Sequence, residues 1–216
     1  MKTPAQLFCL FGLAIALTQP CRGVVAVTWL DDPIVLWTEW NSRYTPLDIN
    51  GDELTDYVFA AAIGFVGVRS EGENQYLIWP SGGHNIGGDV EPLAEGFEIG
   101  PNSGDDSWME WFGNGEGYDG LIACLSTGTA GRFAGQHAYM GVAFEIADEI
   151  HYGWIELIVQ SAFAAAYIYG WGYETDPGVP ILAGASAIPE PSTTMLMIGG
   201  LLTIGCALRR AKERQG

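Results

Sequence analysis

Hydrophobic and aromatic runs of strand length recur along the middle of the chain, and turn-forming residues separate them. The runs are rich in Val, Ile, Tyr, Phe and Trp, while Gly, Asp, Asn and Pro gather between them. Short apolar runs bounded by turn residues favour β-strands over helices. We expect a first hairpin with strands at Val24–Leu30 and Ile34–Trp40 and a turn at Asp31–Pro33.

The next part of the chain predicts further strands and then a long region of turns. Tyr57–Val68 is long and apolar with Gly64 and Gly67 inside it, which favours a buried strand or a bulged pair over a helix. Ser81–Gly120 is dominated by Gly, Asn, Ser and Asp and predicts loops. Two short strands are predicted as well, at Gln75–Trp79 and Ser107–Phe112.

The clearest strand pattern lies late in the chain. Ala138–Ile146, His151–Gln160 and Ala162–Trp171 predict three neighbouring antiparallel strands, a meander. Because side chains alternate along a strand, two sets of residues should face opposite ways. Trp154, Glu156 and Ile158 should lie on one face of the second strand, and Ile155, Leu157 and Val159 on the other.

The remaining strands would form a second sheet packed on the meander, so we predict an all-β, jelly-roll-like β-sandwich.

The first residues are typical of a secretory signal peptide. Lys2 is followed by an apolar run of 11 residues, Leu7–Leu17. A basic residue before an apolar run too short to span a bilayer is the usual pattern of such a signal. We assign residues 1–26 to the signal peptide, with cleavage after Gly23 or after Ala26.

The C-terminal segment combines three features. Pro189-Glu190-Pro191 is followed by a 16-residue apolar run, Thr193–Leu208, and then by a basic cluster that begins with Arg209 and Arg210. As a helix the run would be roughly 24 Å long, slightly short for a bilayer, and the basic cluster should stay in the cytoplasm. The order of the three features resembles the PEP-CTERM sorting signal. A plain membrane anchor is the alternative.

This resemblance implies where the protein goes. Proteins with this signal are recognised by an exosortase after export and are cleaved near the Pro-Glu-Pro motif. The resemblance therefore implies a transient inner-membrane anchor and then a place at the cell surface or outside the cell, in a bacterium that makes exopolysaccharide. We divide the chain into the signal peptide, a β-sandwich body at residues 27–187, and the sorting signal with its single transmembrane helix at residues 188–216.

The end of the body is also similar to the bodies of PEP-CTERM proteins. These bodies commonly end in a Tyr-Gly-Trp strand, an aromatic strand and a Tyr-Glu-Thr turn before the tail. The matching segments here are His151–Ile155, Gly172–Gly178 and Pro180–Gly184. This likeness supports the family but implies no activity.

Charge narrows the range of partners. The chain has a net charge of −17, and between its basic ends only Arg43, Arg69 and Arg132 are positive. Such an acidic body would repel a phosphate backbone, so we exclude nucleic acid as a partner. Cations are suitable partners, although an acidic surface also simply keeps a secreted protein soluble.

One acidic segment has the spacing of a calcium loop. Residues 48–56 place oxygen atoms at loop positions 1, 3, 5, 7 and 9, a spacing that can wrap Ca²⁺. The segment resembles the aspartate-rich loops of dockerins and EF-hands, but Glu53 stands where those have Gly and Phe59 where EF-hands have Glu. A metal-free turn rich in Asx residues is the alternative. The expected ligands are Asp48, Asn50, Asp52, the carbonyl of Leu54, and Asp56.

Aromatic residues beside the Gly-rich loops are candidates for glycan contacts. Trp108, Trp111 and Tyr118 lie in such a region, and flat rings stack on the apolar faces of sugars. The alternative is that these side chains fill the core. A lone Cys124 and three scattered His residues give no catalytic or metal-binding spacing.

We therefore expect an exported, exosortase-sorted surface or matrix protein with a non-catalytic structural or adhesive body. A carbohydrate-binding module that acts on exopolysaccharide is the main alternative. A secreted glycoside hydrolase is a further one, since carboxylates such as Glu156 are numerous, but the chemistry needs two of them about 5–9 Å apart across a sugar.

Overall fold

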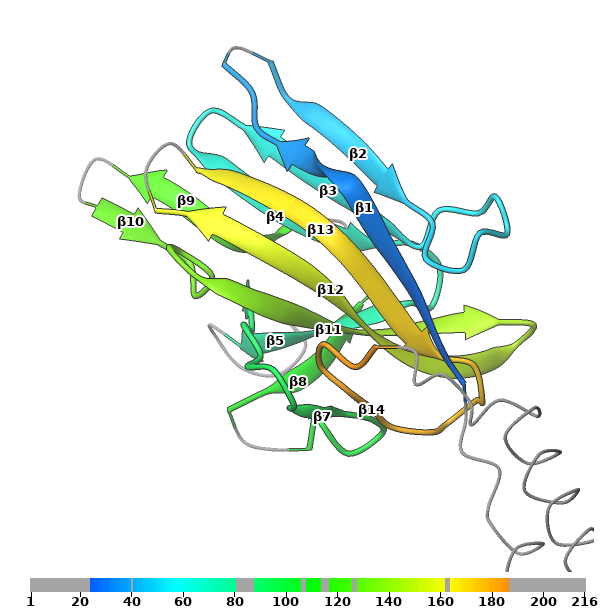
Figure 1. Ribbon diagram of the computed structural model, residues 1–216. Helices are drawn as coiled ribbons and strands as arrows, with labels where there is room; N and C mark the ends of the chain where they lie inside the picture. Colours follow the sequence, from blue (N-terminus) through cyan, green and yellow to red (C-terminus); the bar gives the residue numbers. More distant parts are fainter. Residues whose placement is uncertain are drawn as a thin grey trace, which may run out of the picture.

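The computed structural model describes residues 24–39, 41–80, 88–105, 108–113, 117–125, 128–161 and 164–186 (Figure 1). Within these residues every regular element is a β-strand, which confirms the all-β prediction. The strands are β1 (Val25–Leu36), β2 (Arg43–Leu47), β3 (Tyr57–Ala62), β4 (Phe65–Ser70), β5 (Gln75–Pro80), β6 (Gly88–Val90), β7 (Glu98–Ile99), β8 (Glu110–Gly113), β9 (Asp119–Leu125), β10 (Gly128–Ala130), β11 (His137–Ile146), β12 (Glu149–Gln160), β13 (Ala165–Glu174) and β14 (Ile181–Leu182).

Most of these strands belong to one large mixed sheet. Its order is β1-β13-β12-β11-β5-β6-β9-β4-β3-β2, with β10 added to β9 and β8 added to β5. The sheet is mixed because β6 and β9 run parallel where Asp89 pairs with Gly120. A separate pair, β14 and β7, forms a small second sheet.

The large sheet curves so far that its two ends approach each other. β1 contacts β3, and β13 contacts β4, so the sheet is nearly barrel-like (Figure 1). A single hydrophobic cluster, called here the main core, fills the space inside the curve and draws residues from nearly every strand. Its largest fully buried aromatic side chains are Tyr57, Phe59, Tyr76, Phe133 and Phe144.

A second hydrophobic cluster covers the outer face of the meander. This outer cluster centres on Trp154, which is fully buried, and includes Leu93, Ile99 and Ile181. Ile155, Leu157 and Val159 face the main core instead. The two faces predicted for this strand are therefore confirmed, since Trp154 lies on one face and this second set lies on the other.

The late meander is confirmed as predicted. β11 pairs antiparallel with β12 from end to end, and β12 pairs with β13. The β11–β12 turn consists of Ala147 and Asp148, which have positive φ angles of 53° and 66°. Positive φ at both central residues is typical of the two-residue turns that join twisted strands.

The first predicted hairpin is wrong. β1 is one strand that pairs with β13 on both sides of the Asp31–Pro33 segment, and the register shifts between Trp29 and Ile34. The segment is a bulge, not a turn. Local turn chemistry favoured a reversal of the chain, but the long partner strand β13 continues past the segment, and pairing with it satisfies the backbone on both sides.

Other predictions are refined by the structure. Tyr57–Val68 forms a hairpin, β3 and β4, with a tight turn in which Gly64 has a φ of 73°. The region Ser81–Gly120 contains the short strands β6, β7 and β8 as well as loops, and the first two were missed because each is only two or three residues long.

The predicted signal peptide and the predicted sorting signal fall almost wholly outside the described residues. Pro189, Glu190, Pro191, Arg209 and Arg210 all lie there, as do residues 1–23. Across the part of the chain that the structure does describe, no helix has the length and apolar character needed to cross a bilayer.

Candidate functional site

The loop between β2 and β3 is organised by its own polar side chains. The two carboxylate oxygens of Asp48 accept hydrogen bonds from the backbone N–H groups of Gly51 (2.7 Å) and Glu53 (2.8 Å). Asn50 Oδ1 accepts the N–H of Asp52 at 3.1 Å, and Asp52 Oδ1 accepts that of Leu54 at 2.8 Å. The loop is therefore a series of Asx turns, a conformation that Asp and Asn residues favour.

Glu53 adopts the backbone conformation that calcium loops usually give to glycine. Its φ is 71°, and Gly51 has a φ of 79°. A positive φ is uncommon for a side chain other than Gly, Asn or Asp. The loop thus makes the expected sharp turn at position 6 in spite of the missing glycine.

Asp56 is turned into the body of the protein. Its Oδ2 accepts the N–H of Ile49 at 2.7 Å, and its Oδ1 accepts the side-chain amide of Asn74 at 3.0 Å. Burial raises the pKa of Asp56 from 3.8 to about 6, and these hydrogen bonds and the neighbouring Asp48 modify that shift. Trp171 Nε1 donates to the Ile49 carbonyl at 3.0 Å, which ties the loop to β13.

The predicted calcium ligands therefore divide into two groups. Asp48, Asn50 and Asp52 lie together in the exposed turn, whereas Asp56 faces the interior, and the side chain of Leu54 is exposed. Among the residues that the structure describes, no three His, Cys, Asp or Glu side chains are grouped so as to hold a metal ion. Any calcium at this loop would thus have to draw on backbone carbonyls or water for much of its coordination.

The three aromatic residues predicted to contact glycans do not form one site. Trp111 packs in the outer cluster beside Tyr152, with ring centroids 5.7 Å apart, and its Nε1 donates to the Gly100 carbonyl. Tyr118 lies elsewhere, against Tyr44 at 5.9 Å. Trp108 is 37% exposed and remains accessible.

Two further exposed tryptophans have a ring face covered by the protein. Trp29 packs against the buried Trp154, with centroids 5.4 Å apart and the ring planes tilted by 41°. The guanidinium of Arg132 lies over the ring of Trp79 at 4.5 Å and is itself ion-paired with Glu91. These contacts hold the indole rings in structural roles.

An open hollow near the start of β13 contains a different pair of aromatic residues. It has a volume of about 350 Å³ and is lined by Val35, Trp37, Gln160, Ala165 and Tyr167. Val35 lies near the end of β1 and Trp37 directly follows that strand, while the others come from the end of β12 and the start of β13. We call it the β1–β13 hollow, and it combines apolar surface with a single amide, as ligand pockets commonly do.

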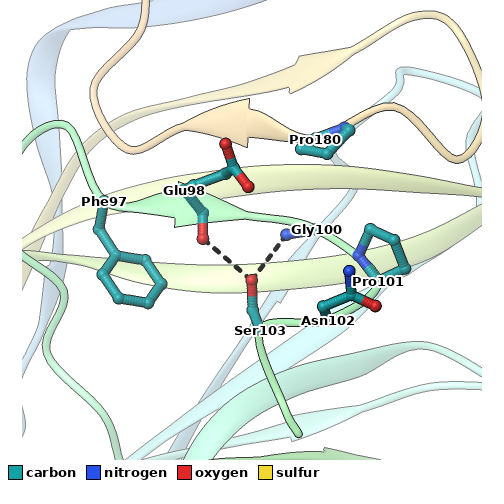
Figure 2. A pocket seen from close by; sticks show the side chains of 7 residues that line it. All are labelled: Phe97, Glu98, Gly100, Pro101, Asn102, Ser103 and Pro180. Carbon is teal, nitrogen blue, oxygen red and sulfur yellow. Dashed lines mark hydrogen bonds between the residues drawn. The ribbon is translucent and has the colours of Figure 1, made fainter. Parts of the chain in front are cut away.

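A smaller hollow of about 210 Å³ lies beside β7 and Pro180 (Figure 2). The Ser103 hydroxyl accepts the Gly100 N–H at 2.8 Å and donates to the Glu98 carbonyl at 2.9 Å. These bonds close a local turn, which explains the hollow as a structural feature of the loop.

Glu156, the carboxylate considered for hydrolase chemistry, is already engaged. Its Oε1 lies 2.5 Å from His137 Nε2 across the β11–β12 pair. The Glu156 side chain is largely buried, and that of His137 is exposed. The pair links two neighbouring strands on the outer face.

The residues of the β1–β13 hollow were not singled out from the sequence. Trp37 and Tyr167 both lay in segments predicted to be strands, and alternation places Val35 and Trp37 on the same side of the first of them. That pattern was the available signal. The pairing of β1 with β13, which brings the two aromatic residues together, joins segments far apart in the chain.

Comparisons of the chain with protein-family models, with curated proteins and with solved structures give no match.

Proposed function

We propose that this chain is an exported, exosortase-sorted surface or matrix protein whose β-sheet body is non-catalytic and has a structural or adhesive role. The observation that carries the proposal is the order of features at the two ends. A secretory-type signal precedes the body, and Pro189-Glu190-Pro191, an apolar run and a basic cluster follow it. The exosortase and the export machinery are the partners this implies.

The geometry of the body suits a protein that is held from one side. Val25, at the start of β1, pairs with Glu174, at the end of β13, and Thr175 N donates to the Val24 carbonyl at 3.0 Å. Ala185, close to the last described residue, packs on the same outer cluster as Val25. The chain thus enters and leaves the body near one end, which leaves the opposite end free to meet other molecules (Figure 1).

The test is cell fractionation in the native host with a tag placed inside the body, combined with intact-mass measurement of the exported protein. We expect the protein outside the inner membrane and trimmed near Pro189-Glu190-Pro191. A matched variant with both prolines changed to Ala should stay untrimmed and associated with the membrane. Retention of the unchanged protein in the cytoplasm would refute the proposal.

Carbohydrate binding is the second function that we propose. It is supported by aromatic side chains with accessible rings, notably Trp37 and Trp108, on a body that is otherwise strongly acidic. Exopolysaccharide is the ligand that the export route suggests. A glycan array probed with the exported protein tests this function as a whole, and binding to no glycan would remove it.

We also propose, as a finer description of the fold, that the curved sheet acts as two layers in the manner of a jelly roll. The layer of β1, β13, β12 and β11 would face the layer of β9, β4, β3 and β2 across the main core. An experimental structure in which β1 and β2 are hydrogen-bonded to each other would instead make the sheet a closed barrel.

A further inference from the structure

We propose that the β1–β13 hollow binds a sugar residue of a neutral polysaccharide, with the apolar face of the sugar ring against Trp37 and Tyr167 and a hydroxyl group at the amide of Gln160. This inference rests on the proposed carbohydrate-binding function and gives it a site and a class of ligand. The site differs from the one that the sequence suggested around Trp108.

The backbone fixes the outward direction of the apolar lining. Val35 on β1 pairs directly with Tyr167 on β13. Leu36, next to Val35, and Ile168, next to Tyr167, are fully buried in the main core. Because neighbouring residues on a strand face opposite ways, Val35 and Tyr167 are held on the outer face by their buried neighbours.

This outer surface exposes large apolar side chains. Trp37 is 40% exposed and Val35 is 39% exposed, and both line the same hollow. Unlike Trp29 and Trp79, Trp37 has no ring or guanidinium stacked on it among the described contacts. An accessible aromatic face of this kind is the surface on which the C–H groups of a sugar ring stack.

The floor of the hollow leaves room for a ring. Ala165 pairs with Gln160 at the point where β12 and β13 meet, and its side chain is only a methyl group. The volume of about 350 Å³ is at the lower end of the range for small-molecule sites. The hollow therefore suits one or two sugar residues of a longer chain.

The polar group in the lining matches a hydroxyl-rich ligand. Gln160 is exposed at the end of β12, and its amide offers both donors and an acceptor. A sugar hydroxyl can donate to the amide oxygen or accept from the amide nitrogen. The two aromatic rings thus provide stacking, and the amide of Gln160 provides hydrogen bonds that orient the sugar.

Charge decides between classes of polysaccharide. All five lining residues are uncharged, although the whole chain has a net charge of −17. An anionic polysaccharide would meet no cation among the described residues that line the hollow, and the net negative charge of the chain would repel it. A neutral polysaccharide avoids both penalties, so we commit to that class.

The location allows a long polymer to reach the site. Tyr167, the partner of Val35, lies seven residues along β13 from Glu174, the partner of Val25, which is roughly 20 Å at the usual rise of a strand. The described chain enters the body at the start of β1, and Ala185, close to its last described residue, packs on the same outer cluster as Val25. The hollow therefore lies toward the end of the body that is remote from the start of β1.

The test measures binding of the exported protein to a soluble neutral glucan and, in parallel, to polygalacturonate, by affinity electrophoresis and calorimetry. We expect binding to the glucan that weakens about tenfold in Trp37→Ala and in Tyr167→Ala. Tyr167→Phe, which keeps the ring, should bind as the unchanged protein does. Thermal melting of each variant checks that it is folded.

Trp108→Ala is the matched control, because Trp108 is exposed to a similar degree but lies outside the hollow. Glucan binding that is unchanged in Trp37→Ala and Tyr167→Ala overturns the site while leaving carbohydrate binding in place. Loss of binding in Trp108→Ala alone would move the site to the region first suggested by the sequence. Preference for polygalacturonate overturns the ligand class. Binding to neither polymer overturns the inference, while the export proposal is still decided separately by the mass of the exported protein.

Discussion

The carboxylate of Asp56 accepts a hydrogen bond from the side-chain amide of Asn74, with 3.0 Å between Oδ1 and Nδ2. Both residues are buried. The Oδ1 of Asn74 in turn accepts the backbone N–H of Glu145 at 3.0 Å. One amide thus connects the loop before β3, the turn before β5 and strand β11, so the candidate calcium loop is coupled to the core of the protein.

The first prediction concerns pH. The pKa of Asp56 is about 6 in the folded protein, above its usual value of 3.8, chiefly because of burial. The folded state therefore holds this proton more tightly than the unfolded state, and the contribution of Asp56 to stability is fully present below about pH 4 and is lost as the pH rises through 6. Urea unfolding between pH 4 and 7 should show this fall.

The variant Asp56→Asn isolates this contribution, because the half-buried carboxyls of Asp89 and Asp119 also have raised pKa values. We expect the difference in unfolding free energy between the unchanged protein and Asp56→Asn to vary with pH between 4 and 6. Parallel curves across that window would show that Asp56 does not titrate as described.

The second prediction concerns Asn74. Asn74→Ala removes the partner of the Asp56 carboxylate and leaves the N–H of Glu145 without its acceptor. A buried group left without its hydrogen bond costs about 1–3 kcal/mol, and the N–H of Glu145 is only partly buried, so the unfolding free energy should fall by about 2–4 kcal/mol in all. Asn50→Ala is the matched control in the exposed turn, and we expect a loss of at most about 1 kcal/mol there. Equal losses at the two positions would contradict the anchoring role of Asn74.

The sequence predicts those parts of the fold that depend on neighbouring residues. The meander follows from alternation along β12 and from the short turn at Ala147 and Asp148. The hairpin at Asp31–Pro33 was predicted wrongly because its true partner, β13, lies far away in the chain. A local turn signal cannot show that a distant strand will pair on both sides of it.

The candidate sites were likewise predictable only where they depend on residues close together in the sequence. The Asx turns at Asp48 and Asn50 are local, and the sequence indicates them. The inward position of Asp56 depends on Asn74, and the meeting of Trp37 with Tyr167 depends on the pairing of β1 with β13. Contacts of this kind arise from the fold as a whole and leave no mark on sequence spacing.

The third prediction concerns the packing of Trp154. A Cβ placed on Gly172 would lie 2.7 Å from Trp154 Cζ2, and the indole N–H of Trp154 is buried without a hydrogen-bond partner in the described part of the chain. Gly172→Ala must therefore displace the largest side chain of the outer cluster. We expect it to lower the unfolding free energy by about 1–3 kcal/mol and to change the near-ultraviolet circular dichroism.

Gly117→Ala provides the control for that experiment. A Cβ at Gly117 would have no atom of the described residues within 4 Å, so this variant should be close to neutral in stability. A Gly172→Ala protein as stable as Gly117→Ala would mean that Trp154 is less tightly packed than the structure indicates.

The fourth prediction concerns calcium at the loop of Asp48 and Asp52. If calcium binds only the folded protein, a concentration about 100 times its dissociation constant should add about 2.7 kcal/mol to the unfolding free energy. Thermal melting with Ca²⁺ and with EDTA measures the effect. In Asp48→Asn the shift should disappear. A melting temperature that is the same with Ca²⁺ and with EDTA in the unchanged protein would leave the loop as a metal-free Asx turn.

The last prediction concerns the start of the mature protein. Val25 and Ala26 pair with Glu174 and Tyr173 within the sheet, and the Val24 carbonyl accepts the N–H of Thr175. Cleavage after Ala26 would remove these residues from β1 and leave the end of β13 without its partners on that side, although β12 still pairs with it on the other, whereas cleavage after Gly23 keeps the strand whole. If the chain is exported as proposed, Val24 should therefore be the first residue of the exported protein, as read by N-terminal sequencing. A mature chain that begins at Val27 would show that the pairs Val25–Glu174 and Ala26–Tyr173 between β1 and β13 are dispensable.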